Sequence, residues 1–350
     1  MLSDFHSVLC ELEQPDSPLT PGQLSKLSGP TRSDADAFVL FLERIGLERK
    51  RDLITKMVRY AEERFEIDYM DLFRHCMRDS DPLIRRQAIE GLWEDRRPDL
   101  VKSLLEIFTS DEDTSVRAAA ATALGKFLFL AECDELDGQI GTMIERALQS
   151  VIAGEKDIEV TRRAVESIAY INDDSVRRII DQAYSHHDAR MRESGVFAMG
   201  RSADRFWAET VLAELYADLP AMRYEAARAC GELQLERAIG PLDKLVGDPD
   251  VDIRSMAIWA LGQIGGKHAR AIPDRCVESE NELLSTAAAE ALAEMEFADR
   301  SMDLMVYGPD DTQFVEVDLD PESDQDDFLG NANDHDVDAD EWRDDFIELN

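Results

Sequence analysis

The sequence predicts an all-α fold, an α-solenoid in which similar helix pairs stack into a superhelix. The first observation is a fixed period of 31 residues, which relates the positions Thr161, Arg192, Arg223, Arg254 and Ser285. The second is that each of these positions stands in the same short pattern of small and apolar residues. Such periods are typical of stacked repeats, in which one helix pair cannot bury its apolar face alone.

We call these five residues, together with Arg85 and Arg117 further upstream, the anchor positions. The residue before each anchor is apolar, the third and sixth residues after it are small, and the seventh is apolar. In the repeat anchored at Arg254 these residues are Ile253, Ala257, Ala260 and Leu261. Because residues three and four apart share one face of an α-helix, the pattern predicts a helix that packs closely against the next repeat.

The starts and ends of these helices are predicted by their flanking residues. An aspartate precedes each of five helices at a position suited to an N-cap: Asp81, Asp113, Asp157, Asp188 and Asp250. A glycine after the last apolar position is expected to end four of them with a positive φ: Gly125, Gly200, Gly231 and Gly262. Further apolar-periodic segments predict a second helix in each repeat: Leu100–Phe108, Ser175–Tyr184, Phe206–Tyr216 and Ala238–Val246.

Three regions follow from this pattern. Residues 1–66 are expected to form an N-terminal helical cap, with helices at Asp4–Leu12, from a Ser33 capping box to about residue 45, and over 48–64. Residues 67–298 hold about seven repeats. The spacing from Arg117 to Thr161 is 44, so one unit carries extra residues, expected near 127–141. Residues 299–350 are predicted to be an acidic, largely disordered tail.

The pattern Asp-x-x-[Val/Ile]-Arg-x-x-Ala-x-x-Ala-Leu-Gly occurs at Asp113–Gly125 and Asp250–Gly262. It resembles the HEAT-like repeats that are named after phycobilisome lyases, and the resemblance covers roughly residues 67–296. The layout around Phe197–Asp204 is also similar to that of uncharacterised bacterial HEAT-repeat proteins. The resemblance implies the solenoid fold. It also suggests bilin-lyase activity, by analogy of fold alone.

The composition limits the classes of partner. The formal net charge is −37, and residues 303–350 contribute 18 Asp and Glu against one Arg. An acidic surface repels phosphate backbones, so nucleic acid is not an expected partner. No apolar run is long enough for a membrane span. The five scattered cysteines form no CxxC and are expected to be reduced thiols of a cytoplasmic protein, which we also expect to be monomeric.

The candidate partner-binding residues lie off the core stripe of the anchored helices, one, two or five residues after the anchor. They would face outward along the concave surface: Arg162, Arg163, Phe197, Tyr224, Arg228, Met256 and Trp259. Aromatic residues, Met and Arg are enriched at interface cores. The alternative is that Phe197 and Trp259 fill gaps between repeats. The anchor arginines themselves are interpreted as structural, pairing with Asp or with backbone carbonyls.

The tail has three possible roles: a solubilising extension, an attractor of basic partners, or a segment that folds against a groove. In the last case one helical face would dock: Trp342, Phe346, Ile347 and Leu349. Arg86, Arg162, Arg163 and Arg228 would be its basic contacts.

No catalytic motif stands out. The chain has no G-x-S-x-G, no phosphate-binding glycine loop and no H-E-x-x-H. It also lacks the His-Glu dipeptides that hold iron in HEAT-like deoxyhypusine hydroxylase, and His186-His187 is a weak metal candidate. The sequence therefore predicts a non-catalytic scaffold or adaptor with a protein partner and no cofactor. The alternative is a lyase or lyase subunit resembling phycobilisome bilin lyases.

Overall fold

The computed structural model describes residues 4–14 and 17–306, and within these ranges it contains helices and no strand. The N-terminal half has α1 (Asp4–Leu12), α2 (Pro21–Ser25), α3 (Arg32–Arg44), α4 (Leu47–Glu62), α5 (Met70–Cys76), α6 (Pro82–Gly91), α7 (Asp99–Ser110), α8 (Thr114–Glu132) and α9 (Gly138–Gly154). The C-terminal half has α10 (Ile158–Ile168), α11 (Asp174–Tyr184), α12 (Ala189–Arg201), η1 (Arg205–Trp207), α13 (Ala208–Glu214), α14 (Pro220–Glu232), η2 (Glu236–Ala238), α15 (Ile239–Leu245), α16 (Val251–Ile264), α17 (Gly266–Cys276) and α18 (Glu282–Val306).

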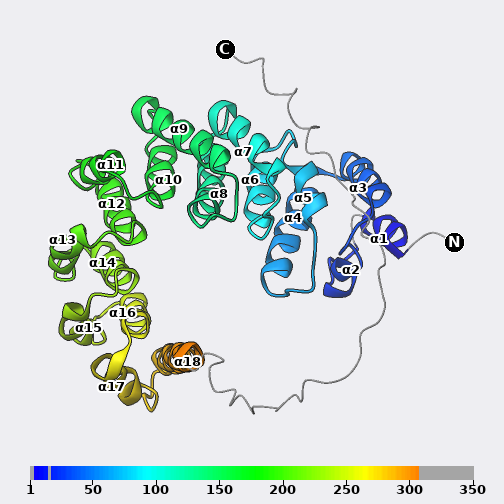
Figure 1. Cartoon of the computed structure of the whole chain (residues 1–350). Coiled ribbons are helices and arrows are strands. Elements are labelled where there is room, and N and C mark those ends of the chain that lie inside the picture. Colours follow the sequence, from blue (N-terminus) through cyan, green and yellow to red (C-terminus); the bar gives the residue numbers. More distant parts are fainter. Residues whose placement is uncertain (1–3, 15–16, 307–350) are drawn as a thin grey trace, which may run out of the picture. The chain divides into compact units, whose positions relative to one another are not determined.

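The helices stack in two rows (Figure 1). In the even row, which we define as the even-numbered helices from α4 to α18, each helix from α4 to α14 packs against the next even-numbered one. In the odd row, the odd-numbered helices from α5 to α15 each pack against the anchored helix of their own repeat. The predicted α-solenoid of helix pairs is confirmed. Every anchor position lies near the start of a helix of the even row.

The predicted N-caps are confirmed. Each of the five aspartates accepts a hydrogen bond from a backbone N–H in the first turn of α6, α8, α10, α12 or α16. The capping box predicted at Ser33 was wrong. The cap of α3 is Thr31, whose hydroxyl accepts from the Asp34 N–H while the Asp34 carboxylate accepts from the Thr31 N–H. Both pairs have the same spacing, so the sequence alone does not distinguish them.

The predicted role of the four glycines as helix ends was also wrong. They lie inside α8, α12, α14 and α16, and none has a positive φ. A Cβ at Gly200 would stand 2.7 Å from the Cα of Ala229 in the next even-row helix, and one at Gly231 would stand 2.8 Å from the Cα of Ala260. These glycines are therefore required for close approach between repeats.

Positive φ occurs instead two residues beyond the ends of α8, α12 and α14. The residues there are Asp134, Ala203 and Gln234, with φ of 58°, 51° and 50°. This left-handed position after a helix usually holds glycine, because a Cβ is strained there. In these repeats the residues with positive φ are thus not the glycines, which lie inside the helices and allow close packing.

Two further features concern the long repeat and the C-terminal end of the stack. The extra residues lengthen α8 to 19 residues and α9 to 17. α18 continues to Val306, so it crosses the boundary predicted at residue 298. The limits of the cap and of the tail otherwise stay predictions, and Trp342, Phe346, Ile347 and Leu349 lie outside the described residues. No helix in the described chain is long and apolar enough to cross a membrane.

Candidate protein-binding site

The anchor arginines link turns to helices, as predicted. The Nη1 of Arg85 donates to the carbonyls of Asp79 and Ser80, and its Nε and Nη2 donate to both carboxylate oxygens of Asp111 in the next turn. Arg117, Arg192, Arg223 and Arg254 repeat the bonds to carbonyls five and six residues earlier. These arginines are occupied by the protein itself, which supports their structural interpretation.

Part of the candidate set is also occupied internally. Arg162 donates to Ser194 at 2.9 Å and to Glu159 at 2.8 Å, and Arg163 donates to Glu159 and to Glu166. Glu166 and Ser194 are buried and hydrogen-bonded to each other. The expectation that these off-stripe positions all face outward was therefore wrong for Arg162, which lies in a polar network between α10 and α12. Arg163 belongs to the same network but stays partly exposed.

Arg228 and Phe197 contact each other instead of presenting a shared surface. The guanidinium of Arg228 lies 3.7 Å from the centroid of the Phe197 ring. It also donates to Glu225 and Glu232, and the residue is only 9% exposed. Arg228 was expected to face a partner, and its burial contradicts this. The pair fills the seam between α12 and α14, which is the gap-filling alternative considered for Phe197.

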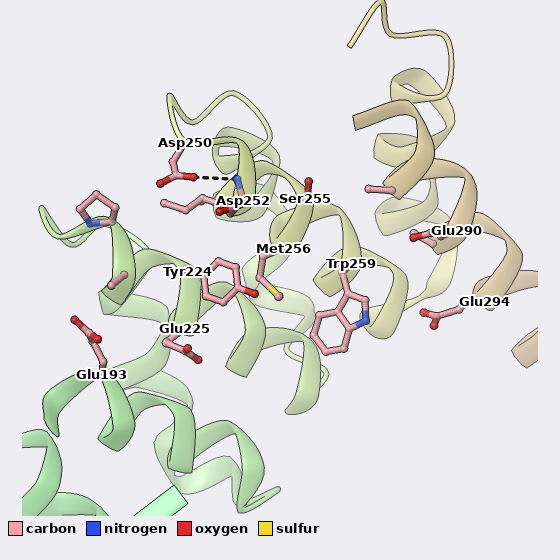
Figure 2. A pocket seen from close by; sticks show the side chains of 15 residues that line it. Glu193, Tyr224, Glu225, Asp250, Asp252, Ser255, Met256, Trp259, Glu290 and Glu294 are labelled. Atoms are coloured by element: carbon pink, nitrogen blue, oxygen red, sulfur yellow. Dashed lines mark hydrogen bonds between the residues drawn. The ribbon is translucent and has the colours of Figure 1, made fainter. Parts of the chain in front are cut away.

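The structure brings the other three candidates together. Tyr224 on α14 and Met256 and Trp259 on α16 line one hollow of about 730 Å³ (Figure 2). The hollow extends along the even row from Glu193 on α12 to Glu294 on α18. All three side chains are partly exposed. Burial raises the pKa of the Tyr224 hydroxyl, so this residue stays neutral near pH 7.

Trp259 owes its position to a glycine behind it. A Cβ at Gly231 would stand 2.9 Å from the indole ring of Trp259 and 2.8 Å from the Cα of Ala260. The absence of a side chain at Gly231 therefore lets α16 and its indole lie close against α14. The aromatic floor of the hollow is fixed by the repeat pattern.

The candidate set did not include the carboxylates of the hollow. The lining residues contain six acidic side chains and no basic one: Glu193, Glu225, Asp250, Asp252, Glu290 and Glu294. Glu193 and Glu290 stand one and five residues after their anchors, as Tyr224 and Trp259 do. Their offset was the available signal, but acidic residues are so frequent in this chain that composition concealed it.

A second hollow of about 550 Å³ lies further along the even row, beside Arg86, Trp93 and Arg163. Lys126, which also lines it, donates to the carbonyls of Leu92, Trp93 and Asp95. Burial lowers the pKa of Lys126 to about 8. This ammonium closes the C-terminal end of α6 and has little freedom to bind a ligand.

The thiols and histidines of the described residues lie in the core, in turns or on the surface. Cys76, Cys230 and Cys276 are buried, and burial raises the pKa of the Cys230 thiol to about 12. His186 Nδ1 accepts from the Asp188 N–H, which places it in a turn. Within the described ranges, no three His, Cys, Asp or Glu side chains are grouped to hold a metal ion.

A family model of HEAT repeats matches residues 70–137 and 208–293. The chain therefore contains HEAT repeats, and its fold is the α-solenoid that such repeats form. No curated protein is significantly similar to it in sequence.

Solved structures similar to this chain share low identity with it. YibA of Escherichia coli is 18% identical, over 74% of this chain and 92% of that one, with a TM-score of 0.42. The complex of CpcE and CpcF of phycocyanin lyase from Nostoc sp. PCC7120 is 20% identical, over 68% and 93%, with 0.48. Human deoxyhypusine hydroxylase is 14% identical, over 84% and 96%, with 0.34. Likenesses at this level do not indicate what this chain does.

Proposed function

We propose that this protein is a non-catalytic scaffold or adaptor that binds a partner protein along the even row. The partner would contact the hollow formed by Tyr224, Met256 and Trp259. The observation that carries the proposal is this grouping of two aromatic rings and a thioether, partly exposed and fixed on successive repeats. Aromatic and Met side chains in a concave surface are typical of binding hot spots.

The arrangement of the repeats supports the same interpretation. The anchor arginines and the Arg228–Phe197 pair are used for stacking, whereas the side chains of Tyr224, Met256 and Trp259 stay partly exposed in the hollow. Arg162, Arg163, Phe197 and Arg228 are then supports of the binding face. The bilin-lyase alternative rests on the resemblance of the repeats alone, and we assign no catalytic role to any residue of the hollow.

The test compares proteins that co-purify with the tagged full chain and with the Met256→Ala/Trp259→Ala variant. We expect a defined set of proteins to bind the wild type and to be lost from the variant. The matched control is Phe206→Ala, which removes an exposed aromatic ring on η1, beside α13 of the odd row. Far-UV circular dichroism checks that all three proteins are folded.

The control should retain the partner. If the same proteins bind all three chains equally, the hollow is not the binding site. If partners are lost equally from both variants, the effect is not specific to the even row. Either outcome contradicts the proposal.

A further inference from the structure

The hollow is negatively charged to an extent that its neighbours do not offset. Three of its six carboxylates have a partner: Glu225 pairs with Arg228, Asp250 accepts from the Asp252 N–H, and Glu294 accepts from the Gln263 amide. The other three are Glu193, Asp252 and Glu290, and none of them forms an ion pair with any residue of the described chain. Carboxylates that line one hollow without a cation favour the entry of a positive group.

The preceding repeats provide an internal template for that positive group. Phe197 stands five residues after its anchor, and 31 residues later Arg228 supplies a guanidinium 3.7 Å from the centroid of its ring. Trp259 stands at the same offset in its own repeat. The residue 31 positions later is Glu290, which lines the same hollow.

At the position 31 residues after the aromatic ring, the chain thus has a cation for Phe197, which is Arg228, and a carboxylate for Trp259, which is Glu290. In Figure 2 the indole of Trp259 lies between Met256 and the two carboxylates of α18, Glu290 and Glu294. An indole is the aromatic side chain that binds cations best, and a carboxylate beside it strengthens the binding.

We propose that the hollow binds a positively charged segment of the partner protein, with an Arg or Lys side chain against Trp259 and Glu290. This rests on the proposed function and specifies the partner's chemistry. The apolar neighbours of that cation would contact Tyr224 and Met256. A second copy of this chain, with a net charge of −37, or its own acidic residues 303–350 would bring like charge to the carboxylates and are disfavoured as occupants.

The probe is a short fluorescein-labelled peptide rich in Arg and Leu, and its control is the same peptide with citrulline at each Arg. Citrulline keeps the shape of the side chain and removes its charge. Fluorescence anisotropy with the full chain should give binding of the Arg peptide that weakens with salt. Equal affinity for both peptides would overturn the proposal, as would no binding of the Arg peptide.

General attraction to an acidic protein is controlled by two variants of equal charge. The first is Glu193→Gln/Asp252→Asn/Glu290→Gln, in the hollow. The second changes three exposed carboxylates elsewhere: Glu43→Gln, Glu112→Gln and Glu236→Gln. We expect the hollow variant to bind the Arg peptide about tenfold more weakly, because it loses the carboxylates that pair with the cation. The control variant should bind it at most about twofold more weakly. The same loss in both would mean non-specific attraction.

The aromatic contact is tested separately by Trp259→Phe and Trp259→Leu. Phe should retain most of the affinity and Leu should weaken it, since an aromatic ring attracts a cation and an aliphatic side chain does not. This experiment also separates the two proposals. If co-purified partners depend on Trp259 but not on the three carboxylates, the binding face stands and the cationic partner is excluded. If they depend on neither, both proposals fail.

Discussion

Arg223 and Asp248 are 25 residues apart in the sequence and are joined by two hydrogen bonds of 2.9 and 3.1 Å. The same guanidinium donates to the carbonyls of Ala217 and Asp218, and the same carboxylate accepts from the Asp250 N–H. One ion pair therefore connects the turn before α14 to the turn before α16. Arg85 with Asp111 and Arg117 with Glu155 make the corresponding connections earlier in the stack.

Replacing Arg223 should cost stability more than binding. We expect Arg223→Ala to lower the free energy of unfolding by about 1.5–3 kcal/mol, because a charged, two-bonded contact and two carbonyl partners are lost. Arg223→Lys should recover only part of this, since an ammonium does not form the paired contact. Urea denaturation measures both. The control is Arg237→Ala, which removes an exposed pair with Glu209 and should change the free energy of unfolding much less.

The close-packed glycines should tolerate no methyl group. Gly200→Ala should destabilise the protein by about 1–3 kcal/mol, because the new Cβ would stand 2.7 Å from a backbone atom of α14. Gly240→Ala on α15 is the matched control, since no atom lies within 4 Å of its Cβ position. It should stabilise by up to about 1 kcal/mol through helix propensity. In thermal denaturation, the melting temperatures of the two variants should shift in opposite directions from that of the wild type. Shifts of the same sign would contradict this packing.

The residues with positive φ offer the reverse experiment. Ala203→Gly should raise the free energy of unfolding by about 0.5–1 kcal/mol, since glycine adopts a φ of 51° without strain. Ala213→Gly, in the last turn of α13, should lower it instead, because glycine is unfavourable in a helix. Both alanines are exposed, so packing contributes little to either result. A destabilised Ala203→Gly variant would show that this turn is not strained.

The turn between α6 and α7 should respond to acid. Burial works to raise the pKa of Asp95, but hydrogen bonds from Arg97 and Arg74 outweigh it and hold that pKa below its usual value. Its stabilising effect is therefore complete above the unfolded-state pKa of about 3.9 and is lost as the pH falls toward the lower folded-state pKa. Asp95→Asn should cost about 2 kcal/mol at pH 7, and its difference from the wild type should shrink below pH 4.

Denaturant titrations at pH 7 and at successively lower pH measure this difference. The control is Asp52→Asn, an exposed partner of Lys56 on one face of α4, which should change stability by less than about 0.5 kcal/mol. A cost of Asp95→Asn that stays constant into acid would contradict the role of the buried carboxylate.

The sequence predicts the stack well because its signals are local and periodic. The anchors, the aspartate caps and the apolar stripe each depend on residues within one helix, so spacing alone identifies them. The glycines were misinterpreted because their requirement comes from the neighbouring repeat: Gly200 is explained by Ala229, which no local pattern connects to it. Nothing local distinguishes a helix end from a close contact at these positions.

The lining of the candidate site was predicted in part for the same reason. Tyr224, Met256 and Trp259 were found from residue type and offset, and the structure places them together. Arg228 has the same offset as Trp259 but turns into the seam, because Phe197 and two glutamates of neighbouring turns receive it. Whether a side chain at this offset is exposed therefore depends on which residues the neighbouring repeat places beside it.

The position of Gly231 behind Trp259 means that the proposed binding face can be reshaped from a buried residue. A single added methyl would press on the indole and push α16 from α14, without altering Tyr224, Met256 or Trp259. Natural variants with identical binding surfaces could then differ in selectivity. A comparison of such proteins should therefore include the buried glycines, since a mutational scan of the exposed face alone would overlook them.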